Sequence, residues 1–422
     1  MNALSRRPRP TVVVTGMGVV TSLGIGKSDN WAALTAGKSG IRRITRFPTE
    51  HLKTSIAGMV DFLSSSNSGA AALTAELAST AAEEALGQAG ISGEFGGPLF
   101  LAAPPVEIEW QHRFALNATL QGRSEPFPLL AASRDHGGFE GYFDATQFGT
   151  IAQMLADRFG TRGLPVTLST ACASGATAIQ LAVDAVRRGE TDRALAVAAD
   201  GSATAESLIR FSLLSALSMQ NEVPHKASKP FSRDRDGFVM AEGSAALVLE
   251  TAESASARGA TILGVLLGCG DKADDFHRTR SKPDGSPAIA AVRAAIADAG
   301  VEPQAVDYIN AHGTSTPEND KMEALSMSAV FGNRMGEIPI SSNKSMIGHT
   351  LSAAGAIEAV FSLLTMSEGR IPPTINYDNP DAAIPLDVVP NAARDGDVAT
   401  VISNSFGFGG QNVCLVLARE PV

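Results

Sequence analysis

The residue best suited to chemistry in this sequence is Cys172, in the run Val-Thr-Leu-Ser-Thr-Ala-Cys-Ala-Ser-Gly-Ala over residues 166–176. An apolar, β-branched segment stops there in small residues, and an alanine-rich helical pattern follows over residues 176–188. This pattern predicts a cysteine at the corner between a strand and a helix. Unpaired N–H groups and the helix dipole favour a thiolate there over a thiol, so Cys172 is a candidate nucleophile. The alternative is a small buried packing residue.

Two histidines follow apolar runs that are typical of strands. His312 lies in Asn-Ala-His-Gly-Thr-Ser-Thr over residues 310–316, and His349 lies in Asn-Lys-Ser-Met-Ile-Gly-His over residues 343–349. Both are expected to emerge from strand ends, as Cys172 does. A neutral imidazole can donate a hydrogen bond to an oxygen on which negative charge develops. A single histidine, taken alone, is more often structural.

A fourth motif is Asn-Ser-Phe-Gly-Phe-Gly-Gly over residues 404–410. Its glycines can adopt positive φ angles, so the turn can aim the backbone N–H of Phe408 at a substrate oxygen. In this order the four motifs resemble those of the β-ketoacyl-acyl-carrier-protein synthases, the condensing enzymes of fatty acid synthesis. They look most like the type II branch, and the resemblance runs from about Thr11 to Arg419.

The resemblance implies a catalytic triad of Cys172, His312 and His349. Cys172 would hold an acyl chain as a thioester, and the histidines would stabilise the enolate formed when a malonyl thioester loses carbon dioxide. Lys344 would be an active-site lysine that maintains local polarity around His349. The alternative for Lys344 is a solvated side chain, the commonest fate of lysine.

Further roles follow from the same resemblance. The N–H groups of Cys172 and Phe408 would form an oxyanion hole, and the Phe408 ring would act as a gate between the acyl pocket and the malonyl site. Thr314 and Thr316 would bind a phosphopantetheine arm, although a β-turn role is also open to them. The other predicted substrate-binding residues are Ser207 and Phe211 in the acyl pocket and Phe406, mainly as a packing residue.

Some relatives bind a monovalent cation, and the matching positions here can be identified. They are Asn310, Glu358, Ser403 and Asn404. Glu358 alone has a simpler explanation, a buried carboxylate that is hydrogen-bonded to backbone. No redox cofactor is expected. The phosphopantetheine is not a cofactor of this chain either, because it arrives on the acyl carrier protein.

Composition limits the partners and the compartment. The 422 residues are 44% hydrophobic and 18% charged, with a formal net charge of −10. This charge argues against nucleic acid or an anionic membrane as the main partner. It also means that an acidic carrier protein would need a local basic patch. Three cysteines at no metal-binding spacing fit a reducing cytoplasm, and neither a signal peptide nor a membrane-spanning run is predicted.

The sequence repeats itself in a way that predicts the fold. Residues 81–91 resemble residues 291–301, and residues 172–176 resemble residues 352–356. Alternating strands and helices predict parallel sheets covered by helices. Two halves, 1–259 and 260–422, would then pack as one unit, in agreement with the thiolase-like fold of the family: duplicated βαβαβαββ halves in five α-β-α-β-α layers. The alternative is chance similarity between alanine-rich helices.

A segment of about residues 98–157 has no evident counterpart in the second half and is predicted to be an insertion. In the family it helps to build the acyl pocket and the dimer surface. A homodimer is expected, with the strand near Thr167 pairing across the interface. The family often carries a basic cluster that docks the carrier protein, but residues 61–70 contain no Lys or Arg. Arg123 and Arg210 are alternative docking candidates.

The predicted function is therefore a β-ketoacyl-acyl-carrier-protein synthase of fatty acid elongation, located in the cytoplasm. A condensing enzyme of a specialised lipid or polyketide pathway is an alternative. A non-elongating partner subunit resembling a chain-length factor is another, but such subunits lack the nucleophile that Cys172 provides. Thiolases place their cysteines in other motifs, and a Cys-His hydrolase would not explain a second histidine.

Overall fold

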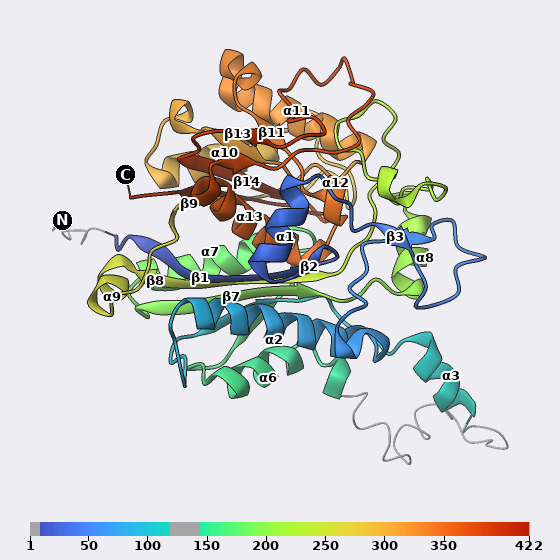
Figure 1. Ribbon diagram of the computed structural model, residues 1–422, viewed down its shortest axis with the longest axis horizontal. Helices are drawn as coiled ribbons and strands as arrows, with labels where there is room; N and C mark the ends of the chain where they lie inside the picture. The colour runs from blue at the N-terminus through green and yellow to red at the C-terminus, as the bar shows by residue number, and fades with distance from the viewer. Residues whose placement is uncertain (1–8, 119–143, 422) are drawn as a thin grey trace.

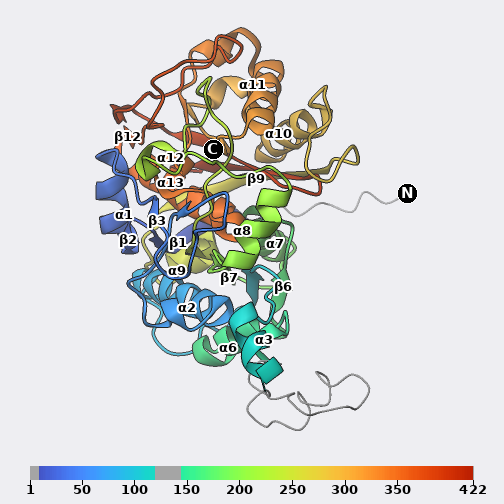
Figure 2. The ribbon, with the colours of Figure 1, turned by 90° about the vertical axis from the view of Figure 1, so that its right-hand side faces the viewer.

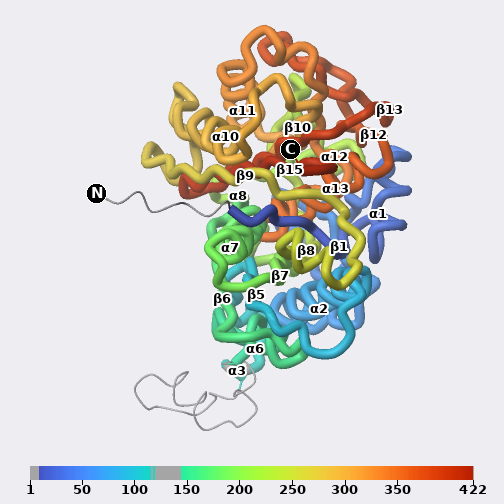
Figure 3. Tube along the Cα trace, turned by 90° about the vertical axis from the view of Figure 1, so that its left-hand side faces the viewer, coloured from blue at the N-terminus to red at the C-terminus, as the bar shows by residue number. Residues whose placement is uncertain are grey.

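A computed structural model describes residues 9–118 and 144–421 as an α/β fold built on two groups of five strands (Figure 1). The first group runs β1 (Val12–Thr21), β8 (Gly243–Thr251), β7 (Arg193–Asp200), β5 (Leu99–Ala102) and β6 (Val166–Leu168). The second runs β9 (Gly264–Ala273), β15 (Gln411–Ala418), β14 (Thr400–Phe406), β10 (Tyr308–Asn310) and β11 (Ile340–Ser341). Strand β1 pairs with both β8 and β9, so the groups join in one continuous sheet (Figure 3).

The strands are not all parallel, which corrects one expectation from the sequence. Parallel pairing is found for β5 with β6 and β7, and for β10 with β11 and β14. The pairs β7–β8, β1–β8, β14–β15 and β15–β9 are antiparallel. Strands β14 and β15 are joined by the short turn over residues 407–410, and so short a connection only permits antiparallel pairing.

Helices separate and cover the two groups of strands. Helices α7 (Ser174–Arg187) and α13 (Ala354–Glu368) lie between them, and α13 is buried along most of its length. Helices α2 (Ala70–Gln88) and α6 (Thr150–Phe159) cover the outer face of the first group, and α10 (Ser286–Ala299) and α11 (Pro317–Phe331) that of the second (Figure 2). The predicted five-layer, thiolase-like α/β fold is confirmed.

The two central helices touch backbone to backbone at a pair of glycines. A Cβ atom on Gly175 of α7 would lie 2.6 Å from the Ala356 nitrogen, and one on Gly355 of α13 would lie 2.6 Å from the Ala176 nitrogen. The contact is reciprocal, as expected for related segments that face each other across a two-fold pseudo-axis. It joins the very pair of segments whose sequence similarity predicted a duplication.

Helices α2 and α10, on the two outer faces, end in the same way. Helix α2 is followed by Gly90 with φ of 67°, and α10 by Gly300 with φ of 67°. These left-handed residues end both helices as the sequence pattern predicts.

Part of the predicted insertion is core sheet. Within residues 98–157, strand β5 takes the place among its neighbours that β10 takes in the second half. The segment without a counterpart is therefore shorter than predicted, because a four-residue strand beside prolines carries little sequence signal. Residues 119–143, including Arg123, lie outside the described residues.

The remaining α-helices and strands are short. They are β2 (Gly24–Ile25), α1 (Gly26–Thr35), β3 (Arg42–Arg43), β4 (Ile56–Ala57), α3 (Trp110–Ala118), α8 (Ala205–Leu213), α9 (Ala252–Ala257), α12 (Lys344–Ile347), β12 (Arg370–Ile371) and β13 (Arg394–Asp395). Within residues 9–118 and 144–421, none of the helices has the length and apolar character needed to cross a bilayer.

Candidate active site

Cys172 lies in a strained turn between β6 and α7, as the sequence predicts. The preceding residue, Ala171, has φ of 49°, a left-handed conformation that is uncommon for alanine. Ser174 stabilises the turn, because its hydroxyl accepts a hydrogen bond from the Thr170 nitrogen and donates one to the Ala171 oxygen. The turn presents Cys172, which is 7% exposed, to a pocket at the end of the sheet.

The environment of Cys172 does not favour the thiolate, which corrects the expectation from helix position. Burial raises the pKa of the thiol to about 11, and this effect exceeds the lowering by a backbone hydrogen bond from Phe408 and by the charge of Lys344. Desolvation destabilises a buried charge, whereas the helix start alone offers a smaller effect. A buried thiol with a raised pKa needs a nearby base to take its proton.

The structure brings Cys172, His312 and His349 together. The cysteine sulfur and one ring nitrogen of each histidine all lie within 4.8 Å of one another. The histidine rings are 5.3 Å apart between centroids and nearly perpendicular. Burial, and then the charge of Lys344, hold the pKa of both histidines well below its usual range. Both imidazoles are therefore neutral near pH 7 and can act as hydrogen-bond donors or proton acceptors.

Lys344 is buried rather than solvated. Its Nζ forms an ion pair with the Glu358 carboxylate and lies 3.4 Å from Nδ1 of His312. An ammonium group has only protons to offer, so this contact assigns Nδ1 as an acceptor and leaves the proton of neutral His312 on Nε2. The sequence also allowed Glu358 to be a buried carboxylate that is hydrogen-bonded to backbone. The ion pair rules this out, since the carboxylate contacts Lys344 instead. Burial raises the pKa of Glu358 to about 7, while Lys344 opposes that rise.

Glu323 of α11 is a site residue that the sequence analysis missed. Its Oε1 accepts from the His312 nitrogen at 2.9 Å and from Nδ2 of Asn404 at 3.1 Å, and its Oε2 accepts from the Gly313 nitrogen at 2.8 Å. The buried carboxylate therefore fixes the backbone that carries His312. A signal was present, because Glu323 shares a helix face with Ala324 and Met327, where apolar residues are expected.

The four positions predicted for a cation have the right chemistry for one. Each provides a buried side-chain oxygen without a hydrogen-bond partner in the described part of the chain: Asn310 Oδ1, Glu358 Oε2, Ser403 Oγ and Asn404 Oδ1. Oxygen ligands of this kind suit hard cations. The residues therefore fit the predicted ion, which would supply a fixed positive charge beside Glu358.

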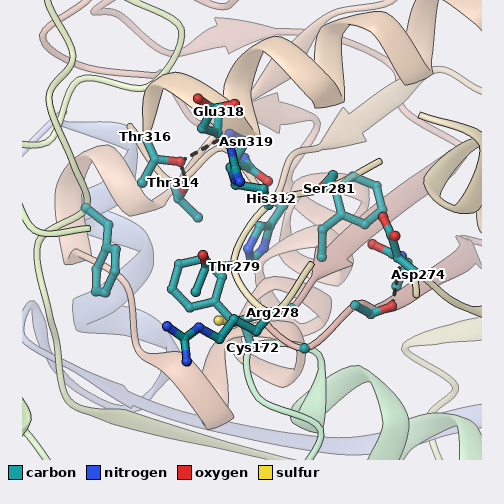
Figure 4. A pocket seen from close by; sticks show the side chains of 18 of the residues that line it. Cys172, Asp274, Arg278, Thr279, Ser281, His312, Thr314, Thr316, Glu318 and Asn319 are labelled. Atoms are coloured by element: carbon teal, nitrogen blue, oxygen red, sulfur yellow. Dashed lines mark hydrogen bonds between the residues drawn. The ribbon is translucent and has the colours of Figure 1, made fainter. Parts of the chain in front are cut away.

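One pocket is lined by most of the predicted substrate residues (Figure 4). Its walls include Cys172, His312, His349, Thr314, Thr316, Phe211, Phe406 and Phe408. The hydroxyls of Thr314 and Thr316 are 2.9 Å apart. Phe211 stacks edge-on against Phe238, which stacks against His349, with centroids 5.3 Å apart in both pairs. Phe238 was not predicted, since nothing in the local sequence places it between the other two rings.

Ser207 is not among the residues that line this pocket. It lies in the first turn of α8, where its nitrogen donates to the Thr204 hydroxyl and its own hydroxyl lies 3.2 Å from that of Thr204. It therefore takes part in helix capping. Phe408 lies in the turn between Gly407 and Gly409, and Gly409 and Gly410 have φ of 85° and 88°.

The fold and the site together define a thiolase-like acyl-transferring class in which a buried cysteine faces two neutral histidines. The chain matches the family described as Beta-ketoacyl synthase, N-terminal domain, over residues 9–94 and 115–255, and Beta-ketoacyl synthase, C-terminal domain, over residues 263–378. It therefore belongs to the β-ketoacyl synthase family, and the resemblance found from its motifs is confirmed.

Known relatives cover nearly the whole chain. The 3-oxoacyl-[acyl-carrier-protein] synthase 2 of Coxiella burnetii is 36% identical over 417 residues, with 97% of this chain and 98% of that protein covered. The tetracenomycin polyketide synthase ketoacyl synthase alpha subunit of Streptomyces glaucescens is 35% identical over 428 residues, with 99% of each covered.

Solved structures agree. A β-ketoacyl synthase from Burkholderia phymatum STM815 has a TM-score of 0.85 and 33% identity, over 97% of this chain and 100% of that one. A type II polyketide ketosynthase in complex with its acyl-carrier protein has a TM-score of 0.84 and 33% identity, over 98% and 100%.

Proposed function

We propose that this protein is a β-ketoacyl-acyl-carrier-protein synthase that extends an acyl chain in fatty acid elongation. The observation that carries the proposal is the cluster of Cys172, His312 and His349, whose reactive atoms lie within 4.8 Å of one another in a buried pocket. The proposed partner is an acyl carrier protein that delivers both the acyl and the malonyl group on its phosphopantetheine arm. No redox chemistry is involved in the proposed reaction.

The first step is acyl transfer. The Cys172 sulfur attacks the thioester carbonyl, a new carbon–sulfur bond forms, and the bond to the arm's sulfur breaks. Because the pKa of the Cys172 thiol is about 11, its proton must pass to a base as the attack proceeds. Since both nitrogens of His312 are engaged, the unprotonated ring nitrogen of neutral His349 accepts this proton and returns it to the departing thiolate of the arm.

The second step is decarboxylation and condensation. The malonyl carboxylate leaves as carbon dioxide, and its electron pair forms an enolate whose oxygen accepts hydrogen bonds from His312 and His349. The enolate carbon then attacks the Cys172 thioester, a carbon–carbon bond forms, and the cysteine sulfur leaves as a thiolate that takes up one proton from solvent. Lys344 contributes by holding the proton of His312 on Nε2. Donors that are neutral and already oriented stabilise the developing oxyanion most effectively.

The remaining roles are proposals that rest on position. The backbone of Phe408 lowers the pKa of the Cys172 thiol, and its N–H would act with the Cys172 N–H on a thioester oxygen. Its ring lies between flexible glycines and would gate the malonyl site. Thr314 and Thr316 would bind the phosphopantetheine arm. The ion near Asn310 and Glu358 would remain structural.

We also propose a homodimer in the cytoplasm. Strand β6 is the last strand of its group, and its first residue, Val166, is 40% exposed, while Leu164 just before it is 89% exposed. An edge strand with exposed apolar residues is suited to pairing with a second copy. The three cysteines are all free thiols, in keeping with a reducing compartment.

A specialised lipid or polyketide pathway is a second candidate, because the polyketide relative is nearly as similar as the fatty acid relative. The test is intact-mass analysis of the protein with acyl carrier proteins that bear graded fatty acyl chains, followed by malonyl carrier protein. An adduct on Cys172, one carbon dioxide per turnover and a β-ketoacyl product extended by two carbons are expected. An adduct at Cys269 or Cys414, or hydrolysis without carbon–carbon bond formation, would contradict the proposal.

A further inference from the structure

The loop between β9 and α10 forms one wall of the active-site pocket, and the catalytic motifs do not account for it. Its pocket-lining residues are Asp274, His277, Arg278, Thr279, Arg280 and Ser281. In Figure 4, Ser281 lies to one side of His312, while Thr314 and Thr316 lie to the other. Whatever reaches Cys172 through this pocket must therefore pass between this loop and the threonines.

The loop is held in place by specific hydrogen bonds. The Asp274 carboxylate accepts from the nitrogens of Phe276 at 2.9 Å and Lys282 at 2.8 Å. The Arg278 oxygen accepts from the Gly409 nitrogen at 2.8 Å. The backbone that carries the pocket-lining arginines is therefore fastened to itself and to the turn that contains Phe408.

Arg278 and Arg280 are exposed cations with no hydrogen bond or ion pair to their side chains in the described parts of the chain. The arginines nearest the expected docking surface are paired with carboxylates. Arg210, predicted as a docking residue, pairs with Glu107 at 2.6 Å, and Arg42 and Arg46 pair with Asp61. The same pocket is also lined by the exposed carboxylate of Glu318, which lies near Thr316 in Figure 4. In a protein with a net charge of −10, the two unpaired guanidinium groups therefore make the loop side of the pocket its anion-binding side.

The position of the two arginines in the pocket indicates which anion they bind. Cys172 and both histidines are buried, whereas the two arginines are exposed, so the arginines meet the outer part of a bound substrate. A malonyl carboxylate must react at depth beside the histidines. Carboxylates of a carrier protein stay outside the pocket, since only its arm can enter. The group that remains is the phosphate at the outer end of that arm, and guanidinium groups bind phosphate oxygens well.

We propose that Arg278 and Arg280 form a subsite for the phosphodiester that joins the phosphopantetheine arm to its carrier protein. The proposal rests on the proposed function, because that function supplies the arm. It adds a charge contact that neither the threonines nor the triad provides, and it explains how an acidic enzyme can hold an acidic carrier without a basic cluster in residues 61–70.

The test compares two small acyl donors that differ only in the phosphate. One is a fatty acyl thioester of phosphopantetheine methyl ester, which carries the phosphodiester, and the other is the same thioester of pantetheine. Neither contains a malonyl carboxylate or a carrier protein. The measured quantity is the second-order rate constant for acylation of Cys172, followed by intact mass. The variant is Arg278→Gln with Arg280→Gln, and the control is Arg43→Gln, an exposed arginine of β3 outside this pocket.

The wild-type protein is expected to prefer the phosphodiester donor by about tenfold, the size of effect that two exposed, charge-assisted contacts give. The double variant should bring the ratio of the two rate constants close to one, and Arg43→Gln should keep it. The wild-type preference should also shrink in about 0.5 M salt, because exposed charges are screened.

Three results would overturn the subsite. The double variant could keep the wild-type ratio, it could lose both rate constants by the same factor, or it could be impaired only with the whole carrier protein, which would assign the arginines to protein carboxylates. If the wild-type protein were acylated neither by these donors nor by acyl carrier protein, the proposed function would fail instead. Calorimetric binding of phosphopantetheine methyl ester against pantetheine would then still decide the subsite.

Discussion

At the scale of single residues, burial acts on Cys172 more strongly than any neighbouring charge does. The pKa of the thiol is raised to about 11, although Lys344 and the Phe408 backbone both lower it. The resting enzyme therefore carries a protonated cysteine near neutral pH. In the proposed mechanism a histidine takes the proton once a substrate is in place, and a thiol that is protonated at rest should resist adventitious alkylation and oxidation.

The pH dependence of alkylation tests this state. Because the raised pKa delays ionisation, the rate of Cys172 alkylation by iodoacetamide should rise about tenfold per pH unit from about pH 7 to 10 without a plateau. Peptide mapping identifies the modified cysteine, and circular dichroism confirms that the protein stays folded. A plateau below pH 8 would indicate a thiolate at rest and would contradict the assignment.

The histidines should matter more for decarboxylation than for acyl transfer. His312→Ala and His349→Ala each remove a buried donor, and losing one such donor lowers the rate by about 10²–10³. Carbon dioxide release from malonyl carrier protein measures this, with exposed His225→Ala as the control. Wild-type rates in both active-site variants would remove the triad from the mechanism.

The lowered pKa values of His312 and His349 predict a rate of decarboxylation that changes little with pH. Since the pKa of His312 and of His349 lies well below its usual value, both stay neutral as the pH falls through 6.5. The rate of decarboxylation should therefore not drop between about pH 8 and 6, where an ordinary histidine would become protonated. A descending limb centred near 6.5 that disappears in either alanine variant would show that one of them titrates normally.

At the scale of elements, the close contact between α7 and α13 positions the nucleophile. Gly175→Ala and Gly355→Ala each place a methyl group about 2.6 Å from a backbone nitrogen of the facing helix. Overpacking of this kind costs about 1–3 kcal/mol, and it should also slow acylation because α7 begins two residues after Cys172. Chemical denaturation and intact-mass kinetics measure the two effects.

The matched control is Gly87→Ala in α2, where an added Cβ meets no atom within 4 Å. Replacing a helical glycine at an open position should stabilise the protein by about 0.5–1 kcal/mol. Equal stability for Gly175→Ala and Gly87→Ala would mean that the helices can move apart freely.

Elements also explain what could be predicted from the sequence. Cys172, His312 and Phe408 follow strands β6, β10 and β14. His349 follows helix α12 instead of the strand end expected for it. All four lie in local motifs, so short runs of residues identified them. Glu323 could not be found this way, because its partners lie 10 to 81 positions away on other elements. The thiolate expectation failed for the same reason, since burial depends on the whole fold.

Short strands limited the prediction of the fold. The duplication was visible in residues 172–176 and 352–356, which keep the same glycine. Strand β5 was assigned to an insertion because its four residues carry little hydrophobic pattern. Antiparallel pairing was missed because the period of the hydrophobic pattern does not reveal the direction of a strand relative to its neighbour. The boundary near residue 259 stays a prediction.

At the scale of the whole molecule, the edge at β6 should form the dimer interface. Leu164→Asp combined with Val166→Asp introduces charges beside this edge, so the mass in light scattering should fall from twice 43.6 kDa to 43.6 kDa. The control is Leu213→Asp, which changes another exposed leucine (80%) at the end of α8. A dimer that survives the double change, or one that Leu213→Asp disrupts, would place the interface elsewhere.

The position of β1 governs how this chain can fold while it is being made. Val12 pairs with Thr251, and the same strand then pairs with β9, so apart from the two-residue strand β2 the strands that pair with β1 are made about 240 residues after it. At about 5–20 residues per second, that wait lasts on the order of ten seconds to a minute. During this time a run of apolar residues is exposed. We therefore expect that the need for chaperones during synthesis depends more on β1 than on the segments that carry the catalytic residues.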